Sequence, residues 1–530
     1  MKSMKKMLSL LLAAISVSSL AACGGTGNTG NNGGGGIPLN PSKEDFAGQK
    51  MSVICYEAGF GTKWLDEIAD QFEEAYDVTV KVNKSYVSGE LISLLNDNST
   101  ADDVVMALGS MFSAQDKGYL VDLSNVYNSI PEGNTKSVKD SMNAGVYNKL
   151  LTESGKIYQM NWADPVCGII LNKSVLNSIF PNGYEVPNTT DELVEFCNDI
   201  KTQTVKKVYP ISVSTSISYW DYLHWVWWAQ YEGYDSYTDY YYGYYHETQT
   251  DGSVVRKKAT NAETLDQAGR LEAVKVAETL LKKSNGYLHK YADSMDWQEA
   301  QIAFVGQGYA GEDMTECAMM VNGEWLENEV QSYLVNKPQE LEMIKTPVIS
   351  SIVKTLENKD MTDETLSAVI DAIDAGETSY TGVSEKDFAK IKEARSMVYS
   401  ATYDHCLCVP AKSQNKALAI EFLKFMASDL GQSIYAKHLN GLTMPYGTNA
   451  TIGTMTNFVQ SRRNTFKTFT PICLDNSSPL VYRQGLVGYT TGSGAGLESS
   501  LYAGKTAEWV INDTKTTLKA SWSSIIAAAK

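Results

Sequence analysis

Residues 50–82 read KMSVICYEAGFGTKWLDEIADQFEEAYDVTVKV and predict a strand, a helix and a second strand in succession. Residues 49–56 form the apolar run of the first strand, and residues 78–82 alternate as a second strand does. Between them, apolar side chains recur near the helical period of about 3.6 residues, at Trp64, Leu65, Ile68, Phe72 and Tyr76. This order favours an α/β fold of parallel strands joined by crossover helices, in which ligands bind beyond the carboxyl ends of the strands.

The same pattern returns further along the chain. Residues 103–106, 168–171 and 318–321 are short apolar runs typical of buried strands, and helices are predicted over 187–200 and 417–426. Residues 348–402 differ, because they are helical in pattern and rich in Asp, Glu and Lys. We interpret them as an inserted helical element.

The N-terminus carries the features of an export signal. Residues 1–22 combine three lysines with an apolar run that is shorter than the roughly 20 residues of a membrane-spanning helix. The box Leu20-Ala21-Ala22-Cys23 resembles that of bacterial lipoproteins, whose cysteine is acylated. Residues 23–45 then form a Gly/Asn-rich tether. The alternative is a plain secretory signal in which Cys23 has no role.

Composition excludes several partners. Residues 1–22 hold three lysines and no acids, so their removal changes the net charge from −17 to −20. Such an acidic chain argues against nucleic acid and against adsorption on anionic lipid. Seven cysteines follow Cys23, an odd number that leaves at least one unpaired, and we expect most of them to be small buried apolar residues.

Five segments in order carry a family resemblance. The opening strand-helix-strand is the first, and the others are ADDVVMALGSMFSAQDKGYLVDL (101–123), GKIYQMNWADPVCGIILNK (155–173), residues 300–325 ending in NGEW, and VPAKSQNKALAIEFLKFM (409–426). Together they resemble the extracellular solute-binding proteins of family 1, the maltose-binding-protein type. The Tyr-rich stretch 234–245, the insertion 348–402 and the chain after Tyr446 depart from the family pattern.

The resemblance implies a two-lobed, hinged fold of the type II periplasmic-binding-protein kind. It places the N-terminal lobe at 46–162 plus 408–445 and the C-terminal lobe at 163–407 plus 446–530. The chain would cross between the lobes near Trp162–Pro165, Cys406–Val409 and Gly441–Tyr446, and ligand would bind between the lobes as they close.

The resemblance also implies a function. A monomeric, extracytoplasmic lipoprotein, anchored on the outer face of the cell membrane through Cys23, would capture a carbohydrate and deliver it to the permease subunits of an ABC importer, and we expect that carbohydrate to be an oligosaccharide. No cofactor, metal or catalysis is expected. Ten Trp and thirty-one Tyr supply flat apolar faces for sugar rings, and carboxylates accept hydrogen bonds from hydroxyls.

Eight residues are candidates for ligand contact. Tyr219 and Trp220 begin a helix whose first residues face the cleft in the family, and Trp325 matches a cleft tryptophan of the family. The remaining candidates lie after predicted strands or at the expected crossings: Glu57, Ser110, Trp162, Asp164 and Tyr446. Glu57 and Ser110 also suit turn or capping roles.

Other functions remain open. An aromatic and acidic cleft also suits a polyamine, a peptide is a further possible ligand, and paired carboxylates can hydrolyse glycosides. A surface glycan-binding lipoprotein without a transporter is another alternative. The G-x-G-x-x-G at residues 306–311 lacks the strand-to-helix setting of a nucleotide loop, since two acids follow it. Asp404-His405-Cys406-x-Cys408 has no second ligand pair nearby for a metal.

Overall fold

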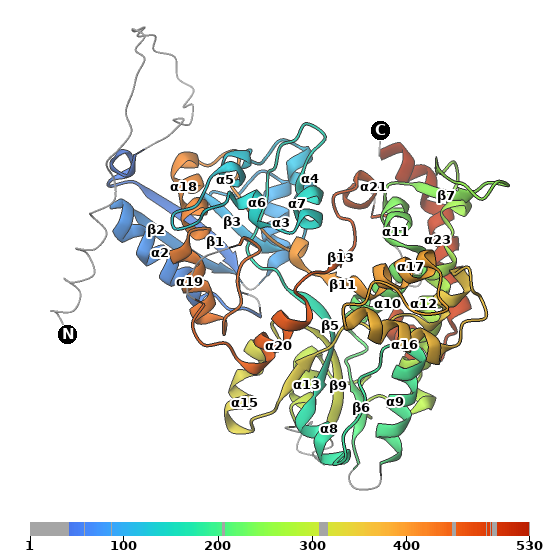
Figure 1. Cartoon of the computed structure of the whole chain (residues 1–530). Helices are drawn as coiled ribbons and strands as arrows, with labels where there is room; N and C mark the ends of the chain where they lie inside the picture. Colours follow the sequence, from blue (N-terminus) through green and yellow to red (C-terminus); the bar gives the residue numbers. More distant parts are fainter. Residues whose placement is uncertain are drawn as a thin grey trace. The chain divides into compact units, whose positions relative to one another are not determined.

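The computed structural model describes residues 42–528, except for residues 58, 86, 204–206, 307–315, 448–451, 484, 488 and 490–495. The predicted export signal, Cys23 and most of the tether lie outside the described residues, as does most of the 306–311 motif. Figure 1 shows the arrangement of the helices and strands. None of the helices in the described part of the chain has both the length and the apolar character needed to cross a membrane.

The first sheet begins with the predicted strand-helix-strand unit. Its strand order is β2 (Thr79–Ser85), β1 (Lys50–Tyr56), β3 (Val104–Leu108), β12 (His405–Cys408) and β4 (Met160–Asn161). The strands β2, β1 and β3 run parallel, as the sequence predicts. β12 runs antiparallel to both β3 and β4, so its first residues lie at the edge where β1 and β3 end.

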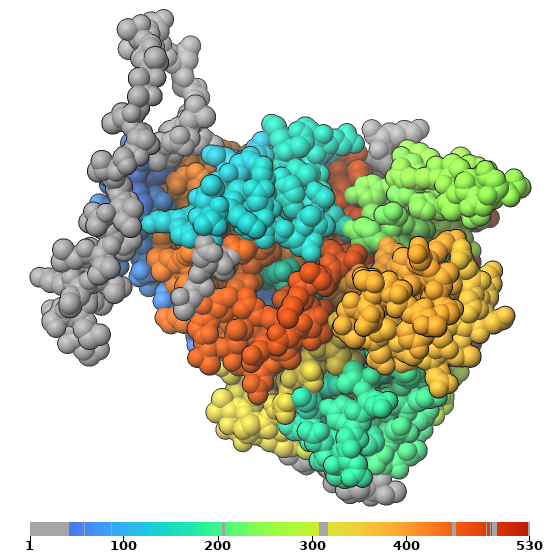
Figure 2. Space-filling view, viewed as in Figure 1, coloured from blue at the N-terminus to red at the C-terminus, as the bar shows by residue number. Residues whose placement is uncertain are grey.

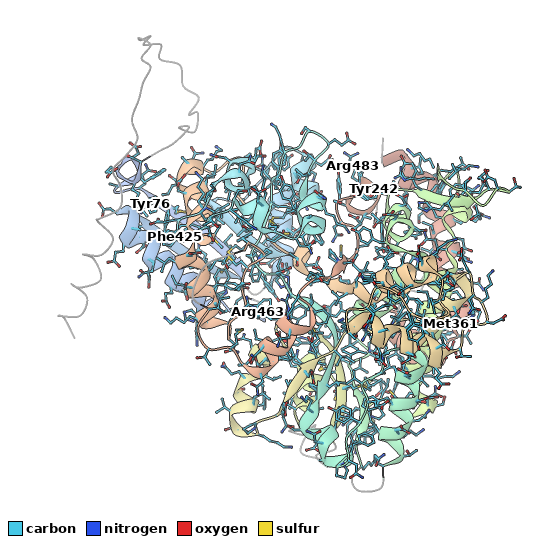
Figure 3. All side chains as sticks on the ribbon, in the orientation of Figure 1. Tyr76, Tyr242, Met361, Phe425, Arg463 and Arg483 are labelled. Atoms are coloured by element: carbon cyan, nitrogen blue, oxygen red, sulfur yellow. The ribbon has the colours of Figure 1, made fainter. Side chains whose placement is uncertain are left out.

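Helices cover both faces of the first sheet. Val104 and Met106 belong to the main core, together with residues of α2 (Lys63–Tyr76) and α18 (Lys416–Met426). Figure 3 labels one contact of this layer, in which the rings of Tyr76 and Phe425 lie 6.4 Å apart. Val105 and Ala107 face a separate apolar cluster with α3 (Ser88–Asn96) and α4 (Phe112–Asp116). The remaining helices of this part are α5 (Ser124–Asn128), α6 (Val138–Ser141), α7 (Ala144–Leu150) and α19 (Asp429–His438).

The second sheet is mixed rather than parallel. Its order is β13 (Thr470–Ile472), β11 (Met397–Ser400), β5 (Val166–Asn172), β9 (Cys317–Gly323) and β6 (Tyr209–Ser212), with β10 (Leu341–Met343) beside β5. The predicted strands at 168–171 and 318–321 are confirmed, but β5 pairs with β9 antiparallel. β6 runs parallel to β9, so both strands end on the same side of the sheet.

Helices pack on both faces of this sheet as well. Ile169 and Leu171 join the main core, whereas Ile170 faces a second apolar cluster that includes Phe304. The helices of this part are α8 (Lys173–Ile179), α9 (Thr190–Thr202), α10 (Asp221–Glu232), α11 (Tyr234–Tyr241), α12 (Ala268–Leu281), α13 (Trp297–Phe304), α14 (Leu326–Glu329) and α15 (Gln331–Asn336). A separate hairpin pairs β7 (Tyr244–Thr248) with β8 (Val254–Lys258).

The acidic segment 348–402 is helical but not separate from the fold. It contains α16 (Asp363–Asp374) and α17 (Glu385–Ser396), whose apolar faces join the main core. Its last residues form β11, a strand of the second sheet. The Arg395 guanidinium, 2.7 Å from the Asp374 carboxylate, ties the two helices together.

Two short connections join the sheets. Residues 162–165 link β4 to β5, at the predicted first crossing, and residues 401–404 link β11 to β12. The second connection lies a few residues before Cys406–Val409, because Cys406–Cys408 already pair within β12. After α19 the chain returns toward the second sheet and forms α20 (Asn457–Thr465). In Figure 2 this orange-to-red segment lies between the cyan residues of the first part and the yellow and green residues of the second.

The C-terminal stretch contacts both parts of the molecule. It continues through α21 (Pro479–Tyr482), α22 (Leu497–Tyr502) and α23 (Ala507–Ala528). Arg483, labelled in Figure 3, donates to the Asp116 carboxylate of α4 at 2.9 and 2.5 Å. α12 packs against both α22 and α23. All seven cysteines after Cys23 are buried and unpaired.

Candidate ligand-binding cleft

A cavity of about 930 Å³ lies where the two sheets meet. From the first sheet it receives the residues after β1 and β3 and those leading into β12, at the edge where ligands bind in α/β folds. From the second it receives the residues after β6 and β9 together with α13 and α15. The lining side chains are mainly aromatic, acidic or amide: Tyr56, Glu57, Phe60, Tyr219, Tyr222, Trp297, Gln298, Gln301, Trp325, Asn328, Glu329, Tyr333, Asp404 and His405.

Trp325 forms the centre of the aromatic wall. It follows β9, and its six-membered ring lies over Gly323, where any side chain would overlap it. Phe60 meets the Trp325 ring nearly edge-on, with centroids 6.1 Å apart, and Tyr222 does so at 6.2 Å. These contacts leave 8% of Trp325 exposed. A flat ring at this place can stack on the C–H face of a sugar.

The two walls touch near the cavity. The Asn328 side chain on α14 donates a hydrogen bond to the Gly59 carbonyl in the loop after β1. A side chain at Gly59 would overlap the Glu329 carboxylate, so glycine permits this close approach. The contact closes the loop at 59–61 onto the second part of the molecule.

Carboxyl groups supply the polar character of the cavity. Glu57 accepts a hydrogen bond from the Thr62 hydroxyl at 2.9 Å, and Glu329 accepts one from the Gln301 amide at 2.6 Å. Burial raises the pKa of Glu329 to about 7 and the pKa of Asp404 to about 6. Burial also lowers the pKa of His405 to about 4, so its imidazole is neutral at pH 7.

The raised carboxyl pKa values predict how stability depends on pH. Folded protein binds more protons at Glu329 and Asp404 than unfolded protein does, so these groups make stability fall as pH rises from about 4 to about 7. We expect the double variant Glu329→Gln, Asp404→Asn to have a flatter profile in urea denaturation of the ligand-free protein. The exposed Glu385→Gln serves as the control and keeps the wild-type slope. An unchanged slope in the double variant would contradict the environment assigned to these carboxyls.

The structure brings three of the eight predicted residues into the cavity lining. These are Glu57, Tyr219 and Trp325. Trp220 instead packs in the core, 1% exposed, with its backbone N–H bonded to Glu498 and its ring 6.4 Å from that of Trp227. It lies away from the cavity because successive residues of a helix point about 100° apart.

The other four predicted residues also lie outside the lining. Trp162 is buried and stacks on Trp64, with ring centroids 5.9 Å apart. Asp164 accepts a hydrogen bond from the Thr402 hydroxyl at 2.6 Å between the two connections. The last two are Ser110, half-buried after β3, and Tyr446, whose hydroxyl donates to the Asn161 carbonyl in the core.

Sequence reasoning missed several lining residues. Asp404 and His405 enter the site because β12 returns antiparallel and begins at the ligand edge of the first sheet. Phe60 and Glu329 come from a loop and a short helix. The sequence could have indicated Tyr222, because it lies one helical turn after Tyr219. In the structure the two rings stack with centroids 5.5 Å apart.

The family is decided by sequence. A model of the bacterial extracellular solute-binding proteins matches residues 67–451, most of the chain. The chain belongs to this family. Its members act as extracytoplasmic receptors for solutes, as the five-segment resemblance implies. No curated protein matches the chain.

Solved structures share the fold of this solute-binding protein. The apo form of RafE from Streptococcus pneumoniae is 14% identical, with a TM-score of 0.59, covering 91% of this chain and 99% of that one. The GacH receptor of Streptomyces glaucescens is 14% identical, with a TM-score of 0.56 and coverage of 91% and 100%. Lmo0181 from Listeria monocytogenes is 14% identical, with a TM-score of 0.55 and coverage of 90% and 99%. The predicted α/β fold of the two-lobed binding proteins is confirmed.

Proposed function

We propose that this protein binds an oligosaccharide in the cavity between its two sheets and passes it to an ABC importer. The observation that carries the proposal is the cavity lining, in which aromatic rings lie beside carboxyl and amide groups. Rings suit the C–H faces of sugars and polar groups suit their hydroxyls. Structures with the same fold include a receptor described with acarbose and another with cycloalternan, which supports a carbohydrate ligand.

We further propose that the two sheets belong to lobes that open and close about the connections at 162–165 and 401–404. The first lobe would comprise residues 46–162 and 405–445, and the second residues 163–404 and 446–530. This moves the second boundary of the lobes to the start of β12. Glu57, Tyr219 and Trp325 would contact the ligand, together with Tyr222, Asp404 and His405.

The protein would act as a receptor and leave its ligand unchanged. A thermal-shift screen of mono- and oligosaccharides tests binding, since a ligand at 100 times its Kd stabilises the folded state by about 2.7 kcal/mol. We expect at least one oligosaccharide to raise the melting temperature and to be recovered intact. No shift with any sugar, or release of shorter sugars, would contradict the proposal.

We also propose that Cys23 is acylated and holds the protein at the outer face of the membrane, where it meets the permease subunits. The motif at residues 20–23 and the basic and apolar residues before it support this. We expect Cys23→Ser to move the protein from the membrane fraction to the soluble fraction, because the acyl chain supplies the membrane affinity. The buried Cys197→Ser is the matched control and should stay with the membranes. Unchanged partitioning of Cys23→Ser would reject the anchor.

A further inference from the structure

The acids of the cavity form no ion pair with a Lys or Arg in the described part of the chain. Glu57, Glu329 and Asp404 line the cavity, and no Lys or Arg occurs among the described lining residues. Glu57 and Glu329 each accept one hydrogen bond from a neutral side chain. The Asp404 carboxylate has no hydrogen bond or ion pair with any group in the described part of the chain.

Two buried carboxylates elsewhere in the described part of the chain, by contrast, face a base. Glu324 pairs with Arg462, and Asp475 pairs with Lys149 at 3.4 Å. The carboxyl groups of the cavity have no such base among the described lining residues, and they face the space that a ligand would fill.

His405 adds a further acceptor to the cavity wall. Its side chain is 4% exposed, and its Nδ1 lies 2.8 Å from the Ala401 carbonyl oxygen. A carbonyl can only accept, so Nδ1 carries the proton and Nε2 keeps a free lone pair. Nε2 has no protein partner within the described residues. Nε2 of His405, the residue after Asp404, can therefore accept a hydrogen bond from a ligand.

We propose that the cleft selects a sugar that bears a protonated amine, whose ammonium group is held by the Asp404 carboxylate and its neighbouring acceptors. This rests on the proposed function and narrows its ligand to amino sugars or their oligomers. An ammonium has three donors and no acceptor, and its bonds to carboxylates are charge-assisted. The aromatic wall would favour a cation as well. A neutral hydroxyl satisfies the same acceptors without offsetting the charge, and an acidic sugar would be repelled.

Calorimetric titration of the intact protein with matched sugars tests the inference. The probes are glucosamine and galactosamine oligomers and their N-acetylated counterparts of equal length, at a pH where the amines are protonated. We expect the amine form of the recognised sugar to bind at least tenfold more tightly than its N-acetylated form. The preference should shrink as salt is raised, because an ion pair is screened.

Two variants locate the effect. Asp404→Asn should lose most of the preference for the amine over the N-acetylated form, and the exposed Glu385→Gln should keep the wild-type preference. Equal binding of amine and N-acetylated forms would overturn the inference and leave the proposed function standing. Tight binding of spermidine with no binding of any sugar would overturn both.

Discussion

Replacing Arg462 by methionine is expected to lower the free energy of unfolding by about 3–5 kcal/mol, the usual cost of removing one partner of a buried ion pair. The Arg462 guanidinium contacts the Glu324 carboxylate, whose side chain is 1% exposed, without hydrogen-bond geometry between the paired atoms. The guanidinium also donates to the Asp164 carbonyl at 3.0 Å. Without Arg462, Glu324 would keep the Val166 N–H as its one hydrogen-bond partner among the described residues and would form no ion pair with any of them.

Neighbouring substitutions separate this effect from a general loss of charge. Arg463→Met, at the next residue of α20, removes a guanidinium whose one hydrogen bond within the described residues is to the Met455 sulfur, and it should cost about 1 kcal/mol or less. Adding Glu324→Gln to Arg462→Met should recover part of the loss, because no buried charge remains. Urea denaturation measures all three variants. A loss below about 1 kcal/mol for Arg462→Met would show that the pair does not stabilise the connection between the sheets.

Trp325→Ala is expected to weaken ligand binding by about 2–4 kcal/mol, or roughly 30- to 1,000-fold in Kd. Trp325 is the aromatic anchor of the cavity, and its removal takes away both the stacking surface and the packing of Phe60 and Tyr222. Because only 8% of the side chain is exposed, some loss of stability should accompany the change.

Trp220→Ala is the matched control for this prediction. It should lower stability by about 3–5 kcal/mol, as core tryptophans do, and leave the Kd of the folded protein unchanged, because Trp220 lies outside the cavity. Binding is measured by titration at a temperature where both variants remain folded. If Trp220→Ala weakened binding more than Trp325→Ala, the assignment of the two tryptophans would be reversed.

The local sequence pattern predicted helices and strands that each bury one continuous apolar surface. The periodicity of residues 64–76 gave α2, and the apolar runs at 168–171 and 318–321 gave β5 and β9, because each buries one continuous surface. The antiparallel pairing of β5 with β9 could not be predicted, because the two strands are far apart in the sequence and the long chain between them allows either direction. The strand β11 was not predicted, because it is short, follows α17 directly and lies within the segment 348–402 that was interpreted as helical.

The lining of the cavity was predicted in part. Trp325 was expected in the cavity from the family resemblance, and Glu57 because it follows a predicted strand, whose end is placed by the fold class. Tyr219 and Trp220 are adjacent aromatics, yet only Tyr219 lines the cavity. Residue type favours a sugar contact equally at both positions, and only tertiary packing separates them. In the sequence, Asp404 was considered only as part of the motif Asp404-His405-Cys406-x-Cys408, which lacks a second ligand pair for a metal. Its place in the cavity lining depends on β12 running antiparallel to β3.

The central claim is that the cavity at the junction of the two sheets binds an oligosaccharide. Isothermal titration of the wild-type protein and of Trp325→Ala with an oligosaccharide panel that includes amino sugars tests it most directly. The account predicts that at least one oligosaccharide binds the wild type with one site per chain, and that its affinity falls at least 30-fold in Trp325→Ala. An absence of binding by every oligosaccharide, or binding that is equally tight in Trp325→Ala, would contradict it.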